Sequence, residues 1–211
     1  MKKNNKIINQ PSQKEMSEIE KLYKSNNLDD LEAKTRNLIN NYPSFALLFN
    51  ILGIALYKKK NFDEAIFNFN KAIKINDKFY LAYNNLGNCF KVTKKFQESE
   101  FNYKKAIQIN PEYAEAYSNL GMVLAETGKI QEAIINQKNA INIKPNFAEA
   151  YNNLGILFAR LGKYKESITN LKKALEIEPN YAEVYSNLGA SMAELGNYDE
   201  ALINYKKTLK L

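Results

Sequence analysis

The chain has 211 residues, of which 45% are hydrophobic and 25% charged, and its formal net charge at pH 7 is +7. It has no histidine and one cysteine, which excludes an intrachain disulfide and removes the commonest general base and metal ligand. No stretch approaches the roughly 20 consecutive apolar residues that a transmembrane helix needs, so we expect no membrane insertion.

The chain begins with a segment rich in lysine and asparagine. Residues 1–10 are expected to form a disordered basic tail, because they hold too little apolar surface to fold alone. This start is basic, as in a secretory signal peptide, but the apolar core of such a signal is missing. We therefore predict a cytoplasmic protein.

Residues 11–45 are predicted to form a helix pair that matches the later pairs only weakly. Its second helix keeps their register through Leu31 and Leu38. Its first helix, over about residues 13–25, has Glu18 and Ile19 where the later pairs have leucine and glycine. Terminal repeats of a stack are usually divergent, so we interpret this pair as a degenerate, capping repeat.

A glycine then recurs every 34 residues. The five glycines are Gly53, Gly87, Gly121, Gly155 and Gly189. Each follows a leucine, stands four residues after a phenylalanine or tyrosine, and precedes a small residue by twelve positions. A fixed period of this length is typical of a solenoid of stacked units.

Within each period the apolar residues follow helical spacing. Tyr83, Leu86 and Phe90 fall on one face of a first helix, and Phe96 to Ile109 form a second amphipathic segment. Each unit is therefore predicted to be two antiparallel helices of about four turns each. The glycine and the small residue twelve positions later are expected to sit where the two helices cross closely.

Turn residues set the limits of the units. In the last three units a glycine is placed to end the first helix in a left-handed conformation. In the first unit Asn61 is expected to take this conformation. Proline stops the second helix in three units. The predicted units are residues 46–79, 80–113, 114–147, 148–181 and 182–211.

The last unit is incomplete and has no capping helix after it. Its final helix carries Leu202, Tyr205 and Leu209, which would lack a neighbour. Exposed apolar patches usually find partners. Two interpretations stay open: a fragment of a longer protein, or self-association through this uncapped C-terminal hairpin.

These residues resemble the tetratricopeptide repeat, whose motif runs aromatic-x2-Leu-Gly-x2-aromatic and continues through alanine, an aromatic and alanine to proline. The best copy consists of Tyr83, Leu86, Gly87, Phe90, Ser99, Tyr103, Ala106 and Pro111. The resemblance covers residues 46–211 as five units, with tyrosine or phenylalanine in place of the usual tryptophan. It implies an all-α, right-handed superhelical solenoid of antiparallel helix pairs.

The resemblance also implies protein–protein interaction. We expect a non-catalytic scaffold or adaptor that binds an extended peptide or a partner protein in a concave groove lined by the first helices. The alternative is a substrate-recruiting arm of a larger enzyme, such as a glycosyltransferase, whose catalytic domain is not in this chain. No cofactor or metal is expected, since the chain has no histidine and no glycine-rich phosphate loop. Arginine occurs only as Arg36 and Arg160, which argues against a nucleic-acid partner.

Asparagine marks the position before leucine–glycine in four units, and the resemblance places this position in the groove. Regularly spaced amides would clamp a peptide backbone, similar to the asparagine ladder of O-linked N-acetylglucosamine transferases. Further asparagines stand beside this series or match the asparagine positions of chaperone-binding repeat domains. The lysine and arginine residues with which those domains hold a terminal carboxylate are missing from this chain. The candidates are Asn50, Asn84, Asn85, Asn88, Asn119, Asn152, Asn153 and Asn187. The alternative is that these amides only satisfy local polar groups.

Glutamate recurs at a second groove-facing position, as Glu115, Glu149 and Glu183. Leucine occupies this position in the first two units, as Leu47 and Leu81. We include the three glutamates in the peptide-binding set, in a groove that grades from apolar to acidic. The alternative is that they are ordinary solvated acids.

Overall fold

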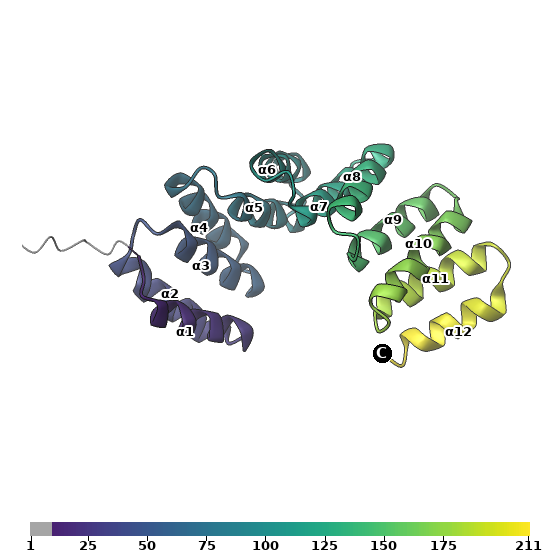
Figure 1. Cartoon of the computed structure of the whole chain (residues 1–211), viewed down its shortest axis with the longest axis horizontal. Coiled ribbons are helices and arrows are strands. Elements are labelled where there is room, and N and C mark those ends of the chain that lie inside the picture. Colours follow the sequence, from purple (N-terminus) through teal and green to yellow (C-terminus); the bar gives the residue numbers. More distant parts are fainter. Residues whose placement is uncertain (1–9) are drawn as a thin grey trace, which may run out of the picture. The chain divides into compact units, whose positions relative to one another are not determined.

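The computed structural model describes residues 10–211, and every regular element in that range is an α-helix (Figure 1). The chain divides into two compact units, one ending at Ile109 and one beginning at Asn110. Of the tail predicted over residues 1–10, all but Gln10 lies outside the described residues.

Unit 1 contains three helix pairs. They are α1 (Gln13–Lys24) with α2 (Leu28–Asn41), α3 (Ala46–Lys58) with α4 (Phe62–Ile75), and α5 (Tyr80–Val92) with α6 (Phe96–Ile109). Each second helix also packs on the first helix of the next pair, α2 on α3 and α4 on α5. The pairs therefore stack in chain order.

Unit 2 repeats this arrangement. Its pairs are α7 (Ala114–Glu126) with α8 (Ile130–Ile143), α9 (Ala148–Arg160) with α10 (Tyr164–Ile177), and α11 (Ala182–Glu194) with α12 (Tyr198–Thr208). Here α8 packs on α9 and α10 packs on α11. The all-α fold of repeated helix pairs is thus confirmed.

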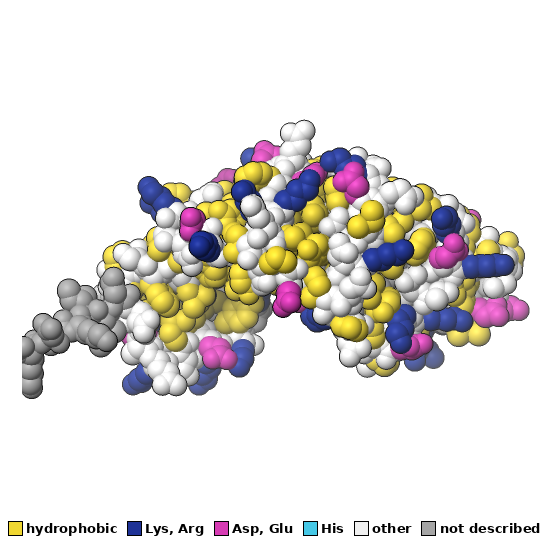
Figure 2. Space-filling view, turned by 45° about the horizontal axis from the view of Figure 1, so that its top comes forward, with side chains coloured by type: hydrophobic (Ala, Val, Ile, Leu, Met, Phe, Trp, Pro, Cys, Tyr) yellow, Lys and Arg dark blue, Asp and Glu magenta, His cyan; other side chains and the backbone are white. Residues whose placement is uncertain are grey.

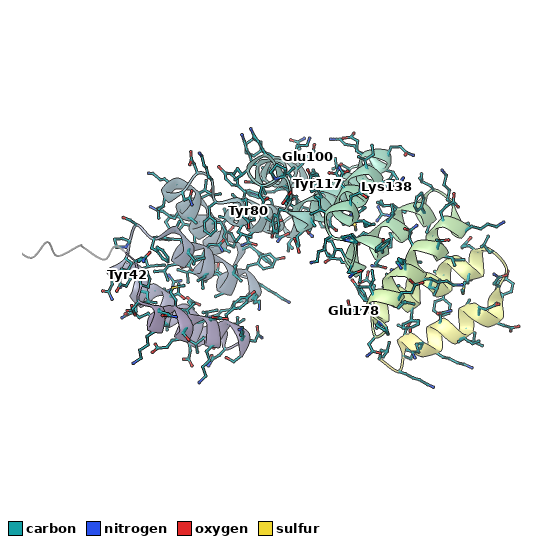
Figure 3. The ribbon with its side chains drawn as sticks, in the orientation of Figure 1. Tyr42, Tyr80, Glu100, Tyr117, Lys138 and Glu178 are labelled. Carbon is teal, nitrogen blue, oxygen red and sulfur yellow. The ribbon has the colours of Figure 1, made fainter. Side chains whose placement is uncertain are left out.

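Side-chain caps fix the start of α1. The Ser12 hydroxyl accepts the backbone N–H of Glu15 at 3.3 Å, and the Glu15 carboxylate accepts the backbone N–H of Ser12 at 2.7 Å. This reciprocal capping box satisfies two N–H groups that the helix leaves unpaired. Tyr42, which ends α2 and is labelled in Figure 3, donates to the same carboxylate at 3.3 Å and so connects the two helices.

The repeated glycine lets the helices of a pair cross closely. A Cβ atom on Gly53 would lie 2.6 Å from the ring of Phe69, and one on Gly87 would lie 2.7 Å from the ring of Tyr103. The Ser99 hydroxyl donates to the Gly87 carbonyl at 2.8 Å, so the small residue of the second helix sits at the crossing, as predicted. The motif includes the aromatic residue sixteen positions after the glycine, but its role in filling the space opposite the glycine was not predicted.

The first pair inverts this arrangement of sizes. The position of the repeated glycine is taken by Ile19, and the position of the large residue sixteen later is taken by Thr35, which is buried and donates to the Leu31 carbonyl at 2.6 Å. Ile19 and Leu31 belong to one buried cluster. With bulk on the first helix, α1 packs less closely on α2 than the partners of the other five pairs do on each other.

The turns after the first helices share a left-handed residue. In unit 2 it is glycine in all three pairs, with φ between 70° and 81°. In unit 1 the position holds Asn26 (φ 54°), Lys60 (φ 62°) and Lys94 (φ 58°). The expectation that Asn61 takes this conformation is wrong, because Asn61 is needed one residue later, where its side chain accepts the Glu64 N–H and caps α4.

The last helix presents apolar side chains to solvent. Leu209 is 87% exposed, and Leu202 and Tyr205 are exposed as well. This exposure alone does not support the self-association considered from the sequence.

We predict that Gly53→Ala lowers the free energy of unfolding by about 1–3 kcal/mol, because the new methyl group would overlap the buried Phe69 ring. Urea unfolding followed by circular dichroism measures the change. Phe69→Leu, which removes the overlapping ring atoms, serves as the second arm of a double-mutant cycle. The double variant should be more stable than the sum of the two single changes predicts. Strictly additive effects would show that the clash is not the cause.

We also predict that Lys94→Gly stabilises the chain by up to about 1 kcal/mol. A left-handed conformation costs a non-glycine residue about 1–2 kcal/mol, which exceeds the roughly 0.5–1 kcal/mol that glycine loses in backbone entropy. Lys138→Gly, at an exposed position in the interior of α8, is the control, because Lys138 does not have a positive φ and should lose about 0.5–1 kcal/mol. Equal shifts of the two urea midpoints would contradict this account.

Candidate functional site

The structure places all eight candidate asparagines on first helices. Asn50 lies on α3, Asn84, Asn85 and Asn88 on α5, Asn119 on α7, Asn152 and Asn153 on α9, and Asn187 on α11. Four of them are buried, namely Asn50, Asn84, Asn152 and Asn153, and the other four are half-buried. The set therefore does not project as one exposed row.

Three amides of the regular series bond to the neighbouring first helix of the same unit. Asn85 donates to the Asn50 side-chain oxygen at 3.0 Å. In the same way, Asn187 donates to Asn152 at 3.0 Å, and Asn153 donates to the Ser118 hydroxyl at 3.2 Å. Each bond spans 35 residues, so the residue before leucine–glycine donates to the position before its counterpart in the preceding pair. These bonds use one N–H of each donor amide, which has a second N–H and an oxygen.

Asn88 has a different partner. It accepts the hydroxyl of the buried Tyr103 at 2.6 Å, and this bond joins α5 to α6 within one pair. Asn119 is half-buried on α7. The clamp role predicted for the asparagines remains a prediction, and it now has to work through groups that the bonds between helices leave over.

The three glutamates all lie in unit 2 and have different surroundings. Glu115 pairs with Lys144 at 2.9 Å, an exposed pair of small energetic value. Glu183 accepts the Asn152 amide at 3.3 Å, while Glu149 is exposed. The pKa of Tyr181 is raised, mainly by burial and then by the negative charges of Glu183 and Glu149.

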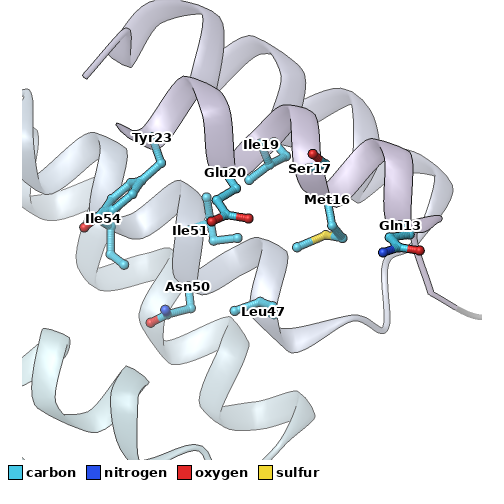
Figure 4. Close-up of a pocket in the computed structure, with 10 residues that line it drawn as sticks. All are labelled: Gln13, Met16, Ser17, Ile19, Glu20, Tyr23, Leu47, Asn50, Ile51 and Ile54. Carbon is cyan, nitrogen blue, oxygen red and sulfur yellow. The ribbon is translucent and has the colours of Figure 1, made fainter. Parts of the chain in front are cut away.

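A pocket of about 600 Å³ opens between α1 and α3, and the sequence analysis did not predict it. Figure 4 shows side chains of the two helices facing each other across it. We call it the α1/α3 groove. Its apolar lining consists of Met16, Ile19 and Tyr23 from α1 and of Leu47, Ile51 and Ile54 from α3.

Two features of the sequence account for the α1/α3 groove. Because Ile19 replaces glycine, α1 is held off, and α1 does not approach α3 as closely as α3 approaches α5. In addition, α3 has Ile51 and Ile54 where α5 has Asn85 and Asn88. The absence of the leucine–glycine pair from α1 was the feature of the sequence that could have predicted the groove.

The cysteine of this unit is not a reactive group. Cys89 is fully buried in the cluster that contains Leu52 and Leu56. Burial raises the pKa of its thiol to about 12, which keeps it protonated at neutral pH. Within residues 10–211 no group of acidic, cysteine or histidine side chains has the arrangement of a metal site. In the same range no helix has the length and apolarity to cross a bilayer.

Comparison with protein families gives four matches, all to the tetratricopeptide repeat. They cover residues 46–79, 80–113, 113–179 and 146–211, which is most of the chain. The chain belongs to the tetratricopeptide repeat family. Together with the twelve helices of the described residues, this membership confirms the all-α helical-repeat solenoid. It also supports a protein-interaction scaffold. Proteins with these repeats are generally non-catalytic.

Solved tetratricopeptide-like structures share the fold. The crystal structure of MamA is 26% identical, with a TM-score of 0.65, over 75% of this chain and 93% of that one. TTC0263, a thermophilic TPR protein in Thermus thermophilus, is 26% identical, with a TM-score of 0.69, over 78% and 90%. YrrB, a TPR protein with an unusual peptide-binding site, is 22% identical, with a TM-score of 0.63, over 83% and 91%. No curated protein gives a significant match.

We predict that Asn85→Ala lowers the free energy of unfolding by about 1–3 kcal/mol, because it leaves the buried Asn50 oxygen without this donor. Asn37→Ala, an exposed change on α2, is the control and should have little effect. Both are measured by urea unfolding. If Asn85→Ala is as mild as the control, the bonds between first helices contribute nothing to the stack.

Proposed function

We propose that this tetratricopeptide repeat protein is an interaction scaffold that binds an extended peptide segment of a partner along the face that the first helices form within a unit. The observation that carries the proposal is the α1/α3 groove, a concave and mainly apolar site on that face. Ligand sites are typically concave and apolar, with a few polar groups that fix orientation.

Within each unit, the first helices carry polar groups that suit a peptide backbone. The amides of Asn85 in unit 1 and of Asn187 in unit 2 are half-buried, and each retains an N–H and an oxygen beyond its bond to the neighbouring helix. Each hydrogen bond to a peptide would add about 0.5–1.5 kcal/mol net. In unit 2, Glu149 and Glu183 would set the preferred charge of the segment. YrrB, a TPR protein with an unusual peptide-binding site, supports the use of such a fold for peptides.

The surface charges favour nucleic-acid binding less than they favour peptide binding. Lysine, acidic and hydrophobic side chains are interspersed over the face shown in Figure 2. Several lysines are held in ion pairs, as Lys59 is with Asp29 at 2.8 Å and Lys144 with Glu115 at 2.9 Å. Such pairs lower the net attraction for phosphate.

Selection of peptides from a random display library on the full chain tests the proposal. A variant with Ile51→Asn and Ile54→Asn carries in α3 the residues that α5 has at the same positions, so it should fold. It should bind the selected peptides at least tenfold more weakly than the wild type. Phe67→Asn, on an exposed side chain of α4, is the control and should leave binding unchanged. Equal binding by all three proteins would place the peptide elsewhere.

A further inference from the structure

The α1/α3 groove continues into a smaller pocket that has polar groups in its lining. This second pocket, of about 200 Å³, shares Tyr23 and Ile54 with the groove. It adds two aromatic side chains and three polar ones, namely Tyr57, Phe69, Lys58, Asn85 and Asn88. An occupant of the apolar groove would therefore meet an ammonium group and two amides at one end.

The lysines at this end of α3 differ in their partners. Lys59 lies 2.8 Å from the Asp29 carboxylate and 2.9 Å from that of Glu32, and these two contacts raise its pKa. Lys58 has no carboxylate partner among the residues that the structure describes. Its Nζ atom instead donates to the Asn26 side chain at 3.2 Å and stands 4.7 Å from the centre of the Tyr23 ring.

The carboxylate within the groove is already compensated. Glu20, on α1, pairs with Lys24 at 2.6 Å, and both side chains are largely exposed. The remaining charge to be matched at the groove is that of Lys58. The lining thus offers a place for a bulky apolar side chain and, next to it, a place for an anion.

We propose that the α1/α3 groove selects peptide segments in which a bulky apolar side chain lies next to an aspartate or glutamate. The apolar side chain enters the groove beside Ile51 and Ile54, next to the residues that the two pockets share, and the carboxylate meets the Lys58 ammonium and the amides of Asn85 and Asn88. This inference rests on the proposed function and gives the partner its chemistry: an acidic, apolar linear segment.

A charge-reversal selection tests the inference. The same random display library is panned on the full wild-type chain, on Lys58→Glu and on Lys60→Glu. Lys60 is the matched control, because it makes the same charge change two residues away but does not line either pocket. Peptides enriched on the wild type and on Lys60→Glu should carry an acidic residue beside an apolar one. Those enriched on Lys58→Glu should carry lysine or arginine at that place.

Affinities then check the selection. By fluorescence polarisation, a wild-type peptide should bind Lys58→Glu at least tenfold more weakly and Lys60→Glu equally well, with circular dichroism showing that both variants are folded. Apolar peptides that lack an acidic preference, or a preference that Lys58→Glu leaves unchanged, would overturn the inference while the proposed function stands. If no peptide is enriched on the wild type, both fail.

Discussion

The contact on which this structure depends is the close crossing of two helices over a residue that has no side chain. At each repeated glycine of α3, α5, α7, α9 and α11, the next helix brings a side chain to within 2.6–2.9 Å of where a Cβ atom would be. Nothing larger than hydrogen fits there without movement, because protein interiors are close-packed. The crossing fixes the separation within each pair, and this in turn fixes how the next pair can stack on it.

The asparagines belong to the same framework as well as to the candidate site. Their amides connect first helices through side-chain bonds from Asn85 to Asn50 and from Asn187 to Asn152. Bonds of this kind hold neighbouring first helices in register, so the polar groups of the face are fixed before any ligand arrives. Affinity benefits when binding groups need not be ordered. A residue series that supports the stack can thus also present a rigid surface.

Much of the fold could be predicted from the 34-residue period, because glycine, leucine and the small residues report local rules that each pair obeys separately. The motif gives an aromatic residue at the position opposite the glycine, but its role as the filler of that space could not be predicted. The five pairs use different residues there, namely Phe69, Tyr103, Gln137, Leu171 and Tyr205, which share only their position and bulk. The α1/α3 groove was missed because it results from an exchange of sizes between Ile19 and Thr35, two residues on different helices. The left-handed conformation predicted for Asn61 was wrong because Asn61 caps α4. Lys60, one residue earlier, takes the left-handed conformation instead.

The loose packing of α1 on α2 has a thermodynamic consequence. Segments with fewer close contacts open locally at a lower free energy than the rest of a protein. One wall of the groove is therefore the part of unit 1 most easily detached. A molecule that binds only the closed form shifts this local equilibrium by mass action. A bound molecule in the groove would consequently slow the exchange of backbone amide hydrogens along α1.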